Sequence, residues 1–352
     1  IHFARLREKV STNTSGFFCW SKKPLSYHSF TGIWKEKFEK LVQREDVKQV
    51  FQNSTKKPFS KIKGYEAKIT LKEATTLKNH TPFKQSPEVT KSTLKMIQEE
   101  IDRGIYEIST SPWAAPAFTI KKATKEGEPT KLRLVIDFSE LSKKTMIRQN
   151  QQRSPDEILF NDFDHRWTHF AVFDMRSSYH QVALDPASAN LMTFRVAGSP
   201  LRYKMMRPGF GFVSSGFFLE ECLRVTLEEP LMRENPDNPI VIRKFIDDMV
   251  VFGTSEEDLF RQVEIVLKKM SEIGLRLNSK KCSFCIKRME WCSFIVMNGR
   301  IFSNNKFLRQ LEEMKKRTPT TLRQTQAAMG LLSYLSRFVP RFSTLAEPIY
   351  SG

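Results

Sequence analysis

Hydrophobic and polar residues follow two kinds of pattern along the chain, and these predict helices and short strands. Over 87–103, Leu94, Ile97 and Ile101 recur at the spacing of one helix face. Ser86 can cap this helix and Gly104 can end it. The same reasoning predicts further helices over 33–51, from Thr254 to about 273, over 305–317, and from Thr321 to about 338.

Shorter apolar runs bounded by turn residues predict strands. We expect strands over 169–175, 240–246 and 249–253. Only Asp247 and Asp248 separate the last two, which predicts a tight hairpin. Two more hairpins are expected over 118–138 and 291–302, the second with its turn at Asn298-Gly299. The first carries basic residues that suit a phosphate clamp: Lys121, Lys122, Lys125, Lys131 and Arg133.

The charge of the chain points to a partner. Its 352 residues include 57 Lys and Arg against 39 Asp and Glu, a formal net charge of +18. Residues 1–100 carry 20 basic and 10 acidic side chains and residues 301–352 carry 8 and 3, so the middle is nearly neutral. We therefore expect basic flanks to hold a polyanion, most simply nucleic acid. An acidic membrane surface is the weaker alternative, because the basic residues do not form one amphipathic helix. No apolar run approaches the roughly 18 residues of a membrane helix.

The cysteines are few and odd in number, which fits a reduced intracellular compartment better than a disulfide scaffold. They are Cys19, Cys222, Cys282, Cys285 and Cys292. The pair Cys282 and Cys285 has C-x-x-C spacing, but no His lies close in sequence to complete a zinc site. We expect packed free thiols and keep zinc as the weaker alternative.

Three aspartates end or separate the predicted central strands. Asp174 ends one strand, and Asp247 and Asp248 lie between two others. Two adjacent like charges in a short turn need a cation or exposure to water. If the strands are neighbours, the carboxylates converge and offer the oxygen ligands that Mg²⁺ prefers. Two such ions would clamp the oxygens of a phosphoryl transfer, whereas the alternative is an ordinary turn and surface role.

Six blocks of the sequence, in order, resemble the reverse transcriptase of LTR retroelements, closest to gypsy-like retrotransposons. The blocks are STSPWAAPAFTIKK, KLRLVIDFSELSKKT, FDMRSSYHQVAL, FIDDMVVFGTSEED, LRLNSKKCSF and LSYLSRFVPRFSTLAEPIY. The resemblance runs from about 66 to 350 and implies a fragment of a Pol polyprotein. It implies an RNA-directed DNA polymerase that extends a primer on an RNA or DNA template.

The resemblance also implies an α+β right-hand polymerase fold of fingers, palm and thumb, with an antiparallel palm sheet packed on helices. We expect residues 1–62 to be a basic N-terminal extension or linker and residues 63–302 to form the fingers and palm. Within these, the palm core is expected at about 165–184 and 211–302. Residues 303–352 are expected to form a helical thumb.

Carried over to this sequence, the family's motifs assign roles to individual residues. Asp174, Asp247 and Asp248 would be the catalytic residues and would bind two Mg²⁺ ions, with Mn²⁺ as a substitute. Residues expected to bind the dNTP are Lys122, Arg133, Tyr179, Phe210 and Gly211. Tyr179 would lie under the sugar and exclude a 2′-hydroxyl.

Residues expected to contact primer or template are Trp291, Ser293, Gln326, Gly330 and Tyr334. The last three recur at spacing four on one helix, and packing between helices is the alternative reason for that stripe. Two positions depart from the family's pattern, because Gly209 stands where Pro usually precedes Phe210 and Ser293 stands where Gly is usual. These departures bear on nucleotide and primer positioning and leave the three aspartates untouched.

The expected partners are an RNA template, a DNA primer–template duplex and dNTPs, with no membrane. A dimer or association with other Pol-derived domains stays open, and we expect a cytoplasmic location within virus-like particles. The alternative function is a catalytically silent nucleic-acid-binding or scaffold subunit of the same fold. An RNA-directed RNA polymerase is disfavoured by Tyr179, because ribonucleotides need room at that position.

Overall fold

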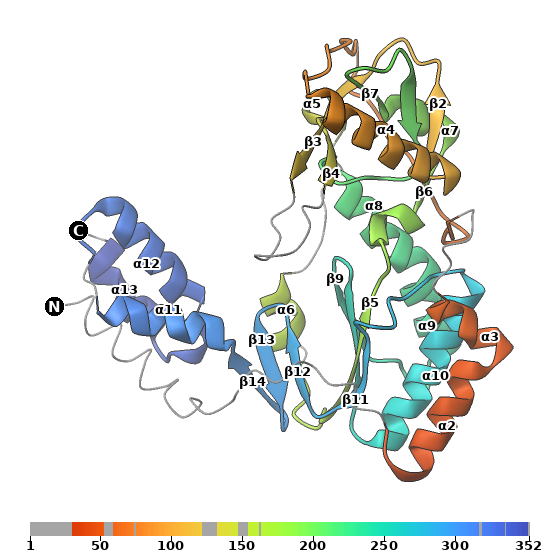
Figure 1. The fold of residues 1–352 in the computed structure, drawn as a ribbon. Coiled ribbons are helices and arrows are strands. Elements are labelled where there is room, and N and C mark those ends of the chain that lie inside the picture. Colours follow the sequence, from red (N-terminus) through yellow and green to blue (C-terminus); the bar gives the residue numbers. More distant parts are fainter. Residues whose placement is uncertain are drawn as a thin grey trace.

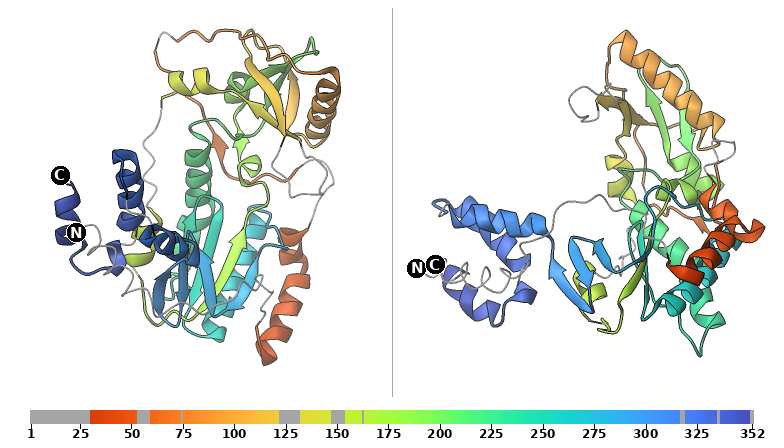
Figure 2. Two further views of the ribbon diagram at one scale, coloured as in Figure 1. Left: turned by 60° about the vertical axis from the view of Figure 1, so that its left-hand side comes forward. Right: turned by 60° about the horizontal axis from the view of Figure 1, so that its bottom comes forward.

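The structure is a computed structural model that describes residues 30–52, 59–73, 75–121, 132–146, 154–161, 163–316, 319–334 and 336–350. A four-stranded antiparallel sheet lies at its centre, with a five-stranded sheet above it and a group of helices at one side (Figure 1). In the right-hand view of Figure 2, the helical group lies to one side of the molecule. This is the expected α+β class, and we use the names palm, fingers and thumb for the parts built around the central sheet, the five-stranded sheet and the helical group.

The central sheet, which we call the palm sheet, has the strand order β11–β5–β10–β9. β5 (His169–Asp174) and β10 (Asp248–Gly253) pair along their whole length. β9 (Ile242–Phe245) flanks β10, and β11 (Ser283–Ile286) flanks β5. The predicted strands over 169–175, 240–246 and 249–253 are therefore present and form neighbours in one sheet.

Alternate residues of β5 and β10 face two different cores, as the period of a strand requires. One face joins the main core through Ala171, Phe173, Met249 and Val251. The other face joins a second core through Phe170, Val250 and Phe252. Asp174 and Asp248 continue the second series, so both carboxylates emerge on the face of the second core.

Helices cover the main-core face of the palm sheet. They are α8 (Ser215–Leu223), the π-helical turn η4 (Arg224–Glu228), α9 (Glu229–Glu234) and α10 (Glu256–Glu272). The helix α10 packs on β5 and β10 and buries Leu259, Val263, Val266 and Met270. The helix expected from Thr254 to about 273 is thus confirmed, and Gly274, which follows it, has a φ of +79°.

Part of the N-terminal region belongs to the palm. The helices α2 (Gly32–Gln43) and α3 (Glu45–Lys48) pack on α10, and the short helix η2 (Gln49–Phe51) follows them. Phe30, Phe38, Val47, Val50 and Ile62 are buried in the main core. Within the described residues, the expectation that 1–62 is an extension or linker is therefore wrong for 30–52 and 59–62. The physical reason is that these segments carry apolar side chains, and burying those side chains against α10 removes them from water.

A buried lysine ties β9 to these helices. The Lys244 side chain is 6% exposed, its Nζ lies 3.1 Å from the Glu228 carboxylate, and it also pairs with Glu220. A buried ammonium is stable only when it is paired, and removing it leaves the two carboxylates without their partner. This ion pair therefore fixes how β9 sits against α8 and η4.

The fingers contain a mixed sheet with the order β2–β8–β7–β3–β4. Its strands are β2 (Tyr106–Ser109), β8 (Arg202–Met205), β7 (Thr193–Val196), β3 (Ala115–Lys121) and β4 (Leu132–Ile136). β3 and β4 form the predicted antiparallel hairpin, whose tip at 122–131 lies outside the described residues. Other elements here are α5 (Ser139–Lys144), α7 (Pro186–Leu191), and the short pair β1 (Glu66–Ala67) and β6 (Ala183–Leu184).

The helix α4 (Pro87–Asp102) packs on this sheet and follows the sequence signals closely. The Ser86 side chain accepts a hydrogen bond from the Val89 N–H, and Pro87 occupies the first turn. Gly104 takes a φ of +69° just after the helix, a backbone conformation that glycine adopts without strain. The predicted start and end of this helix are therefore confirmed.

A three-stranded sheet and the thumb complete the chain. The sheet contains β12 (Arg288–Trp291), β13 (Phe294–Met297) and β14 (Arg300–Ser303), and α6 (Pro155–Phe160) packs on it through the Phe160 and Phe294 rings. The thumb comprises α11 (Asn305–Lys315), α12 (Leu322–Tyr334), η5 (Ser336–Phe338) and α13 (Phe342–Tyr350). Among the described helices, none has both the length and the apolar character to cross a membrane.

Candidate active site

The pairing of β5 with β10 sets two of the predicted carboxylates side by side. Asp174 and Asp248 are direct partners across the two antiparallel strands, and Asp247 lies in the adjoining turn. Side chains of directly opposed residues share a face and lie about 5 Å apart at Cβ. The structure therefore brings all three predicted aspartates together at one end of the palm sheet.

The turn between β9 and β10 is one residue earlier than the sequence predicted. Phe245 pairs with Asp248, so Ile246 and Asp247 form the turn and Asp248 is the first residue of β10. Ile246 has a φ of +59°, a left-handed conformation that a β-branched residue rarely adopts. The expectation that Asp247 and Asp248 form the turn is therefore wrong, and strained backbone carries Asp247 to its place.

The three carboxylates strain one another electrostatically. Burial raises the pKa of Asp248 above its ordinary value, and the charges of Asp247 and Asp174 raise it further. Lys281 gives partial relief, because its Nζ lies 3.1 Å from Asp174 Oδ2. Three clustered carboxylates with one lysine beside them carry excess negative charge. Such a group of oxygens suits a hard divalent cation such as Mg²⁺.

Two residues that support this cluster were not predicted as site residues. Lys281 lies in the LRLNSKKCSF block, whose paired lysines were the available signal. Gln181 is fully buried in the short helix η3 (Ser178–Gln181), and its amide donates to the carbonyls of Arg176 and Arg276 at 2.8 Å. Gln181 therefore ties the segment after Asp174 to the loop before β11. A lone Gln in a sequence gives no signal of such a role.

Next to the carboxylates lies a row of three predicted dNTP-binding residues. The Tyr179 ring meets the Phe210 ring edge-to-face, with centroids 5.2 Å apart. The Arg133 guanidinium also contacts the Phe210 ring, with its Cζ 5.1 Å from the ring centroid. Burial raises the pKa of Tyr179, and the nearby negative charge of Asp247 adds to this. The row thus starts beside Asp247 and ends on the fingers hairpin.

The glycines of this region allow close packing. Gly211 has a φ of +87°, and a side chain there would come within 3.3 Å of the Ile136 carbonyl. At Gly209, a Cβ would lie 2.4 Å from the end of the Met205 side chain. Glycine in place of the family's usual Pro therefore leaves room for Met205. Phe210 between them is 64% exposed. Lys122, the remaining predicted dNTP-binding residue, lies outside the described residues.

Residues 120–317, more than half of the chain, match the family described as "Reverse transcriptase (RNA-dependent DNA polymerase)". The matched region contains the three aspartates, Tyr179 and Phe210. The chain belongs to the reverse transcriptase family. The resemblance to LTR retroelements is also confirmed by the relatives that follow.

Its curated relatives are large polyproteins of retroelements. The chain is 24% identical over 315 residues to the Retrovirus-related Pol polyprotein from transposon 297 of Drosophila melanogaster, covering 90% of this chain and 28% of that polyprotein. It is 28% identical over 255 residues to the Pol polyprotein from transposon gypsy of the same fly, covering 72% and 23%. The Gag-Pol polyprotein of gibbon ape leukemia virus is 25% identical over 273 residues. The chain therefore spans only about a quarter of the first two relatives.

Solved structures show the same fold. The foamy viral protease-reverse transcriptase dRH in complex with double-stranded DNA matches with a TM-score of 0.68 and 17% identity, covering 99% of this chain and 55% of that one. The same viral protein in complex with an RNA/DNA hybrid also matches with a TM-score of 0.68. These matches confirm the α+β polymerase fold.

The predicted primer-side residues Trp291 and Ser293 lie at the end of β12 and in the turn between β12 and β13. Cys292 and Ser293 form a two-residue turn in which both have positive φ, +47° and +72°. Such turns favour Asn-Gly, so Ser293 holds a conformation in which the family's usual Gly would be relaxed. Trp291 is 2% exposed and lies in the second core. Its ring therefore packs in that core in this structure, and the contact of Trp291 with the primer stays a prediction.

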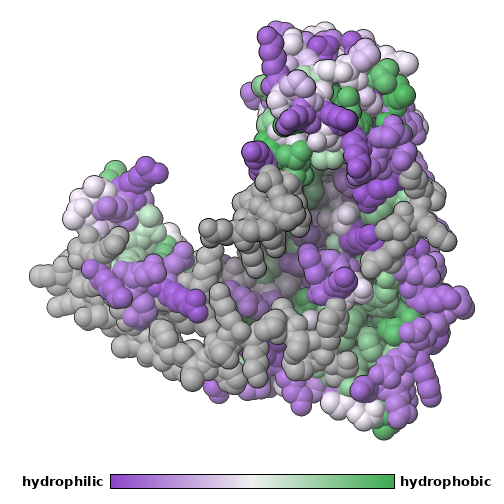
Figure 3. Space-filling model, viewed as in Figure 1, coloured by the Kyte–Doolittle hydropathy of each residue, from purple (hydrophilic) through white to green (hydrophobic). Residues whose placement is uncertain are grey.

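The three thumb residues predicted to contact the duplex differ in their surroundings. Tyr334 donates a hydrogen bond to the Ser293 carbonyl at 2.8 Å and stacks on Phe294 and Phe307. This supports the packing alternative for Tyr334. Gln326 and Gly330 are exposed on α12, and their contact with a duplex stays a prediction. On the face shown in Figure 3, an open concavity separates the thumb from the fingers.

Proposed function

We propose that this chain is an active RNA-directed DNA polymerase that adds dNTPs to a primer on an RNA or DNA template. The observation that carries the proposal is the direct pairing of Asp174 with Asp248, with Asp247 in the adjoining turn. The raised pKa of Asp248 supports it, because neighbouring carboxylates that destabilise one another's charged forms are typical of a metal site. Membership of the reverse transcriptase family supplies the reaction class.

The three aspartates would hold two divalent ions, Mg²⁺ or in its place Mn²⁺. When bound, such ions lower the pKa of the primer 3′-hydroxyl and neutralise charge on the leaving pyrophosphate. The protein's own contribution is placement. β5 and β10 fix two carboxylates by their hydrogen-bond register, and the strained Ile246 turn fixes the third. Lys281, which pairs with Asp174, balances part of the charge until cations bind.

The row of Arg133, Phe210 and Tyr179 would form the nucleotide site. Arg133 would turn from the Phe210 ring toward the triphosphate, joined by Lys122, because a guanidinium grips phosphate oxygens in pairs. Tyr179, held by its edge-to-face contact with Phe210, would present its ring to the sugar and exclude a 2′-hydroxyl. Gly211 would allow the backbone to approach the nucleotide.

The primer and template would occupy the concavity between thumb and fingers. The turn at Ser293 lies near the carboxylates, since the charges of Asp248 and Asp247 affect the pKa of the neighbouring Cys292. Gln326 and Gly330 would face the duplex from α12. Basic flanks would neutralise phosphates, so we expect primer–template affinity to fall steeply as salt rises. An affinity that is flat with salt would contradict duplex binding through the backbone.

Primer extension tests the proposal directly. Purified chain is given an RNA template, a DNA primer, dNTPs and Mg²⁺, and product length is measured on a gel. We expect extension by the wild type, loss of at least about 100-fold with Asp247→Asn, and near-normal extension with the exposed control Asp237→Asn. Equal activity of Asp247→Asn and wild type would refute the catalytic assignment. Tight primer–template binding without extension by the wild type would favour the silent subunit.

Sugar selection is tested by the same assay with NTPs in place of dNTPs. We expect Tyr179→Ala to admit NTPs and Tyr179→Phe to exclude them, because only the ring blocks the 2′-hydroxyl. An unchanged preference for dNTPs in Tyr179→Ala would remove Tyr179 from this role. Extension by the wild type with NTPs at the rate for dNTPs would favour an RNA polymerase.

A further inference from the structure

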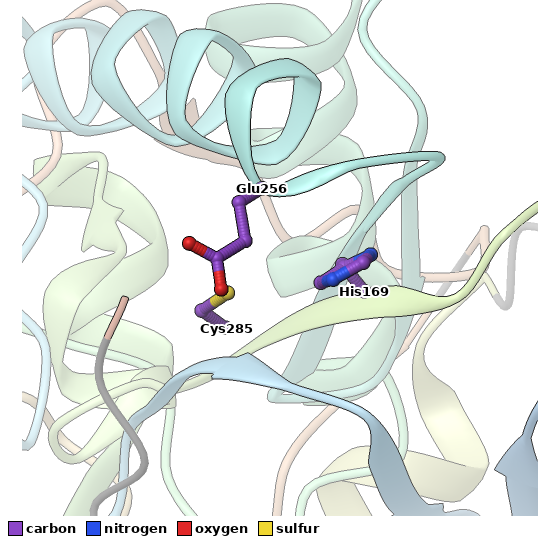
Figure 4. Close-up of side chains that lie close together, drawn as sticks. All are labelled: His169, Glu256 and Cys285. Carbon is purple, nitrogen blue, oxygen red and sulfur yellow. The ribbon is translucent and has the colours of Figure 1, made fainter. Parts of the chain in front are cut away.

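Three side chains with different ligand atoms meet at the end of the palm sheet that lies away from the aspartates. His169, Glu256 and Cys285 each place one ligand atom within 4.8 Å of the others. Figure 4 shows Glu256 reaching from the start of α10 toward the sulfur of Cys285, with the His169 ring beside them on β5. His169 and Asp174 are the two ends of β5, so this cluster lies about 17 Å along the strand from the catalytic end.

The topology of the palm sheet brings these residues together from distant parts of the sequence. His169 begins β5 and pairs with Gly253, the last residue of β10, and Glu256 follows three residues later. On the other side of β5, the register of β11 shifts between Ser283 and Ile286, and Cys285 in this irregularity has a φ of +53°. The two neighbours of β5 therefore bring Glu256, just after β10, and Cys285, in β11, close to His169.

Gly253 lets the start of α10 approach the sheet. A Cβ on Gly253 would lie 2.7 Å from the Leu259 Cβ and 2.9 Å from the Leu259 backbone. Any larger residue would push away the first turn of α10, which carries Glu256. The close approach thus serves the position of the carboxylate as well as the packing of the helix.

The hydrogen bonds around His169 leave one ring nitrogen available. Thr168 Oγ1 lies 3.0 Å from His169 Nδ1 and donates its only proton to the Thr254 carbonyl, 3.2 Å away. It can therefore only accept from His169, which places the imidazole proton on Nδ1. The neutral ring then carries its lone pair on Nε2, the state that a metal-binding histidine needs.

Glu256 has capacity for a cation while it holds the N-terminal helix. Its carboxylate accepts from the backbone N–H of Thr31 at 3.2 Å and from the Thr31 hydroxyl at 2.8 Å. Thr31 precedes α2, so Glu256 already joins that helix to α10. A carboxylate has about four acceptor positions, and these contacts leave room for a metal bond.

A nucleophilic cysteine is the alternative use of such a cluster. Burial and the charge of Glu256 raise the pKa of the Cys285 thiol to about 12, so no thiolate forms there by itself. Reactive cysteines need the opposite surroundings, with positive charge and access to solvent. The buried position of Cys285 therefore disfavours nucleophilic catalysis.

We propose that His169, Glu256 and Cys285 bind one zinc-type ion that fastens the N-terminal helix α2 to the base of the palm sheet. Sulfur, imidazole nitrogen and carboxylate oxygen together suit Zn²⁺ or Co²⁺ and disfavour Mg²⁺, which prefers oxygen alone. Three protein ligands leave a fourth tetrahedral position for water. The ion bonds to the Cys285 sulfur as the thiol proton leaves to solvent, so one proton is released per ion.

The site has one unfavourable neighbour, which provides a test. The positive charge of the exposed Lys287 acts on both His169 and Cys285. It should repel a cation, so Lys287→Gln should tighten binding a few-fold at low salt. A cluster that only packs the fold would show no such dependence.

The experiment uses the full chain with Co²⁺ as the probe and excess Mg²⁺ to occupy the aspartates. We expect one equivalent of Co²⁺ to bind and to give the near-ultraviolet charge-transfer absorption of a cobalt–thiolate bond. Cys285→Ser should abolish this absorption. Cys292→Ser is the matched control, because Cys292 lies near Asp247 and Asp248 and would carry the band if the ion were bound there.

A second measurement is the thermal midpoint with and without Zn²⁺. At 100 times the dissociation constant, we expect Zn²⁺ to raise the wild-type Tm by about 3–8 °C. His169→Gln should lose this shift relative to its own metal-free Tm. Absence of the band in the wild type, its persistence in Cys285→Ser, or its loss in Cys292→Ser would each overturn the proposal.

Discussion

Replacing Asp248 by Asn should stabilise the metal-free protein while it removes metal binding. Asp248 is a direct cross-strand partner of Asp174 and a sequence neighbour of Asp247, and its pKa is raised by burial and by these two charges. The ionised carboxylate therefore opposes folding when no cation is present. Asparagine keeps nearly the same shape and removes the charge.

The magnitude follows from the register. Opposed residues on antiparallel strands lie about 5 Å apart at Cβ, and Coulomb's law at an effective dielectric constant of about 20–80 gives about 1–3 kcal/mol for one pair of charges. Lys281 already compensates part of the charge on Asp174, and it is itself 64% exposed. We therefore expect Asp248→Asn to raise the free energy of unfolding by about 1–2 kcal/mol without metal.

The assay is urea unfolding of wild type and variant, in EDTA and in MgCl₂, at low ionic strength. Mg²⁺ at 100 times its dissociation constant stabilises the wild type by about 2.7 kcal/mol, which exceeds the advantage of the variant. The order of stability should therefore reverse in MgCl₂. Asp237→Asn, an exposed control, should stay within about 0.5 kcal/mol of wild type in both buffers.

The pH dependence gives an independent check of the sign. Because the folded pKa of Asp248 lies above its unfolded value, the penalty is fully present above the folded pKa and disappears as pH falls below the ordinary value of 3.8. The stability difference between variant and wild type in EDTA should shrink over that acidic window. A variant less stable than wild type in EDTA, or a difference that Mg²⁺ leaves unchanged, would refute the reasoning.

Three other substitutions test the packing around the site by urea unfolding. Gly299→Ala should cost more than about 2 kcal/mol, because φ is +64° and the new Cβ would lie 2.0 Å from the His165 carbonyl; a neutral effect would contradict that contact. Ser293→Gly should gain about 0.5–1 kcal/mol, because its φ of +72° suits glycine, and a loss would show that Ser293 is not strained. Lys244→Met should cost about 3–5 kcal/mol through two unpaired carboxylates, whereas a stabilised variant would mean that its desolvation outweighs the pairing.

Local sequence signals predicted much of the fold. The N-cap Ser86 and the stop Gly104 bounded α4 correctly, and the Asn298-Gly299 turn joins β13 and β14 as expected. In each case the physical cause lies within a few residues, in a cap or a left-handed turn. The helix α10 shows the limit of this reasoning, because Ser255 rather than Thr254 caps it.

Features that depend on register could not be predicted in the same way. The turn moved from Asp247-Asp248 to Ile246-Asp247, since a hydrophobic run does not show which residues pair across strands. The convergence of the aspartates was expected only if their strands were neighbours, and the structure supplies that condition. The burial of Trp291 and the contact of Tyr334 with Ser293 depend on tertiary packing between regions far apart in the chain.

The packing of Tyr334 and Phe338 has a consequence for engineering. Both side chains contact the second core under the palm sheet and also the small core of the thumb. A chimera that exchanged the thumb at residue 303 would separate these contacts. The new thumb would then pack on a core whose side chains come from a different protein. A more compatible exchange would move residues 288–350 as one block, which keeps the three-stranded sheet with the thumb helices, and would exchange α6 with it, because Phe160 contacts both Phe294 and Phe338.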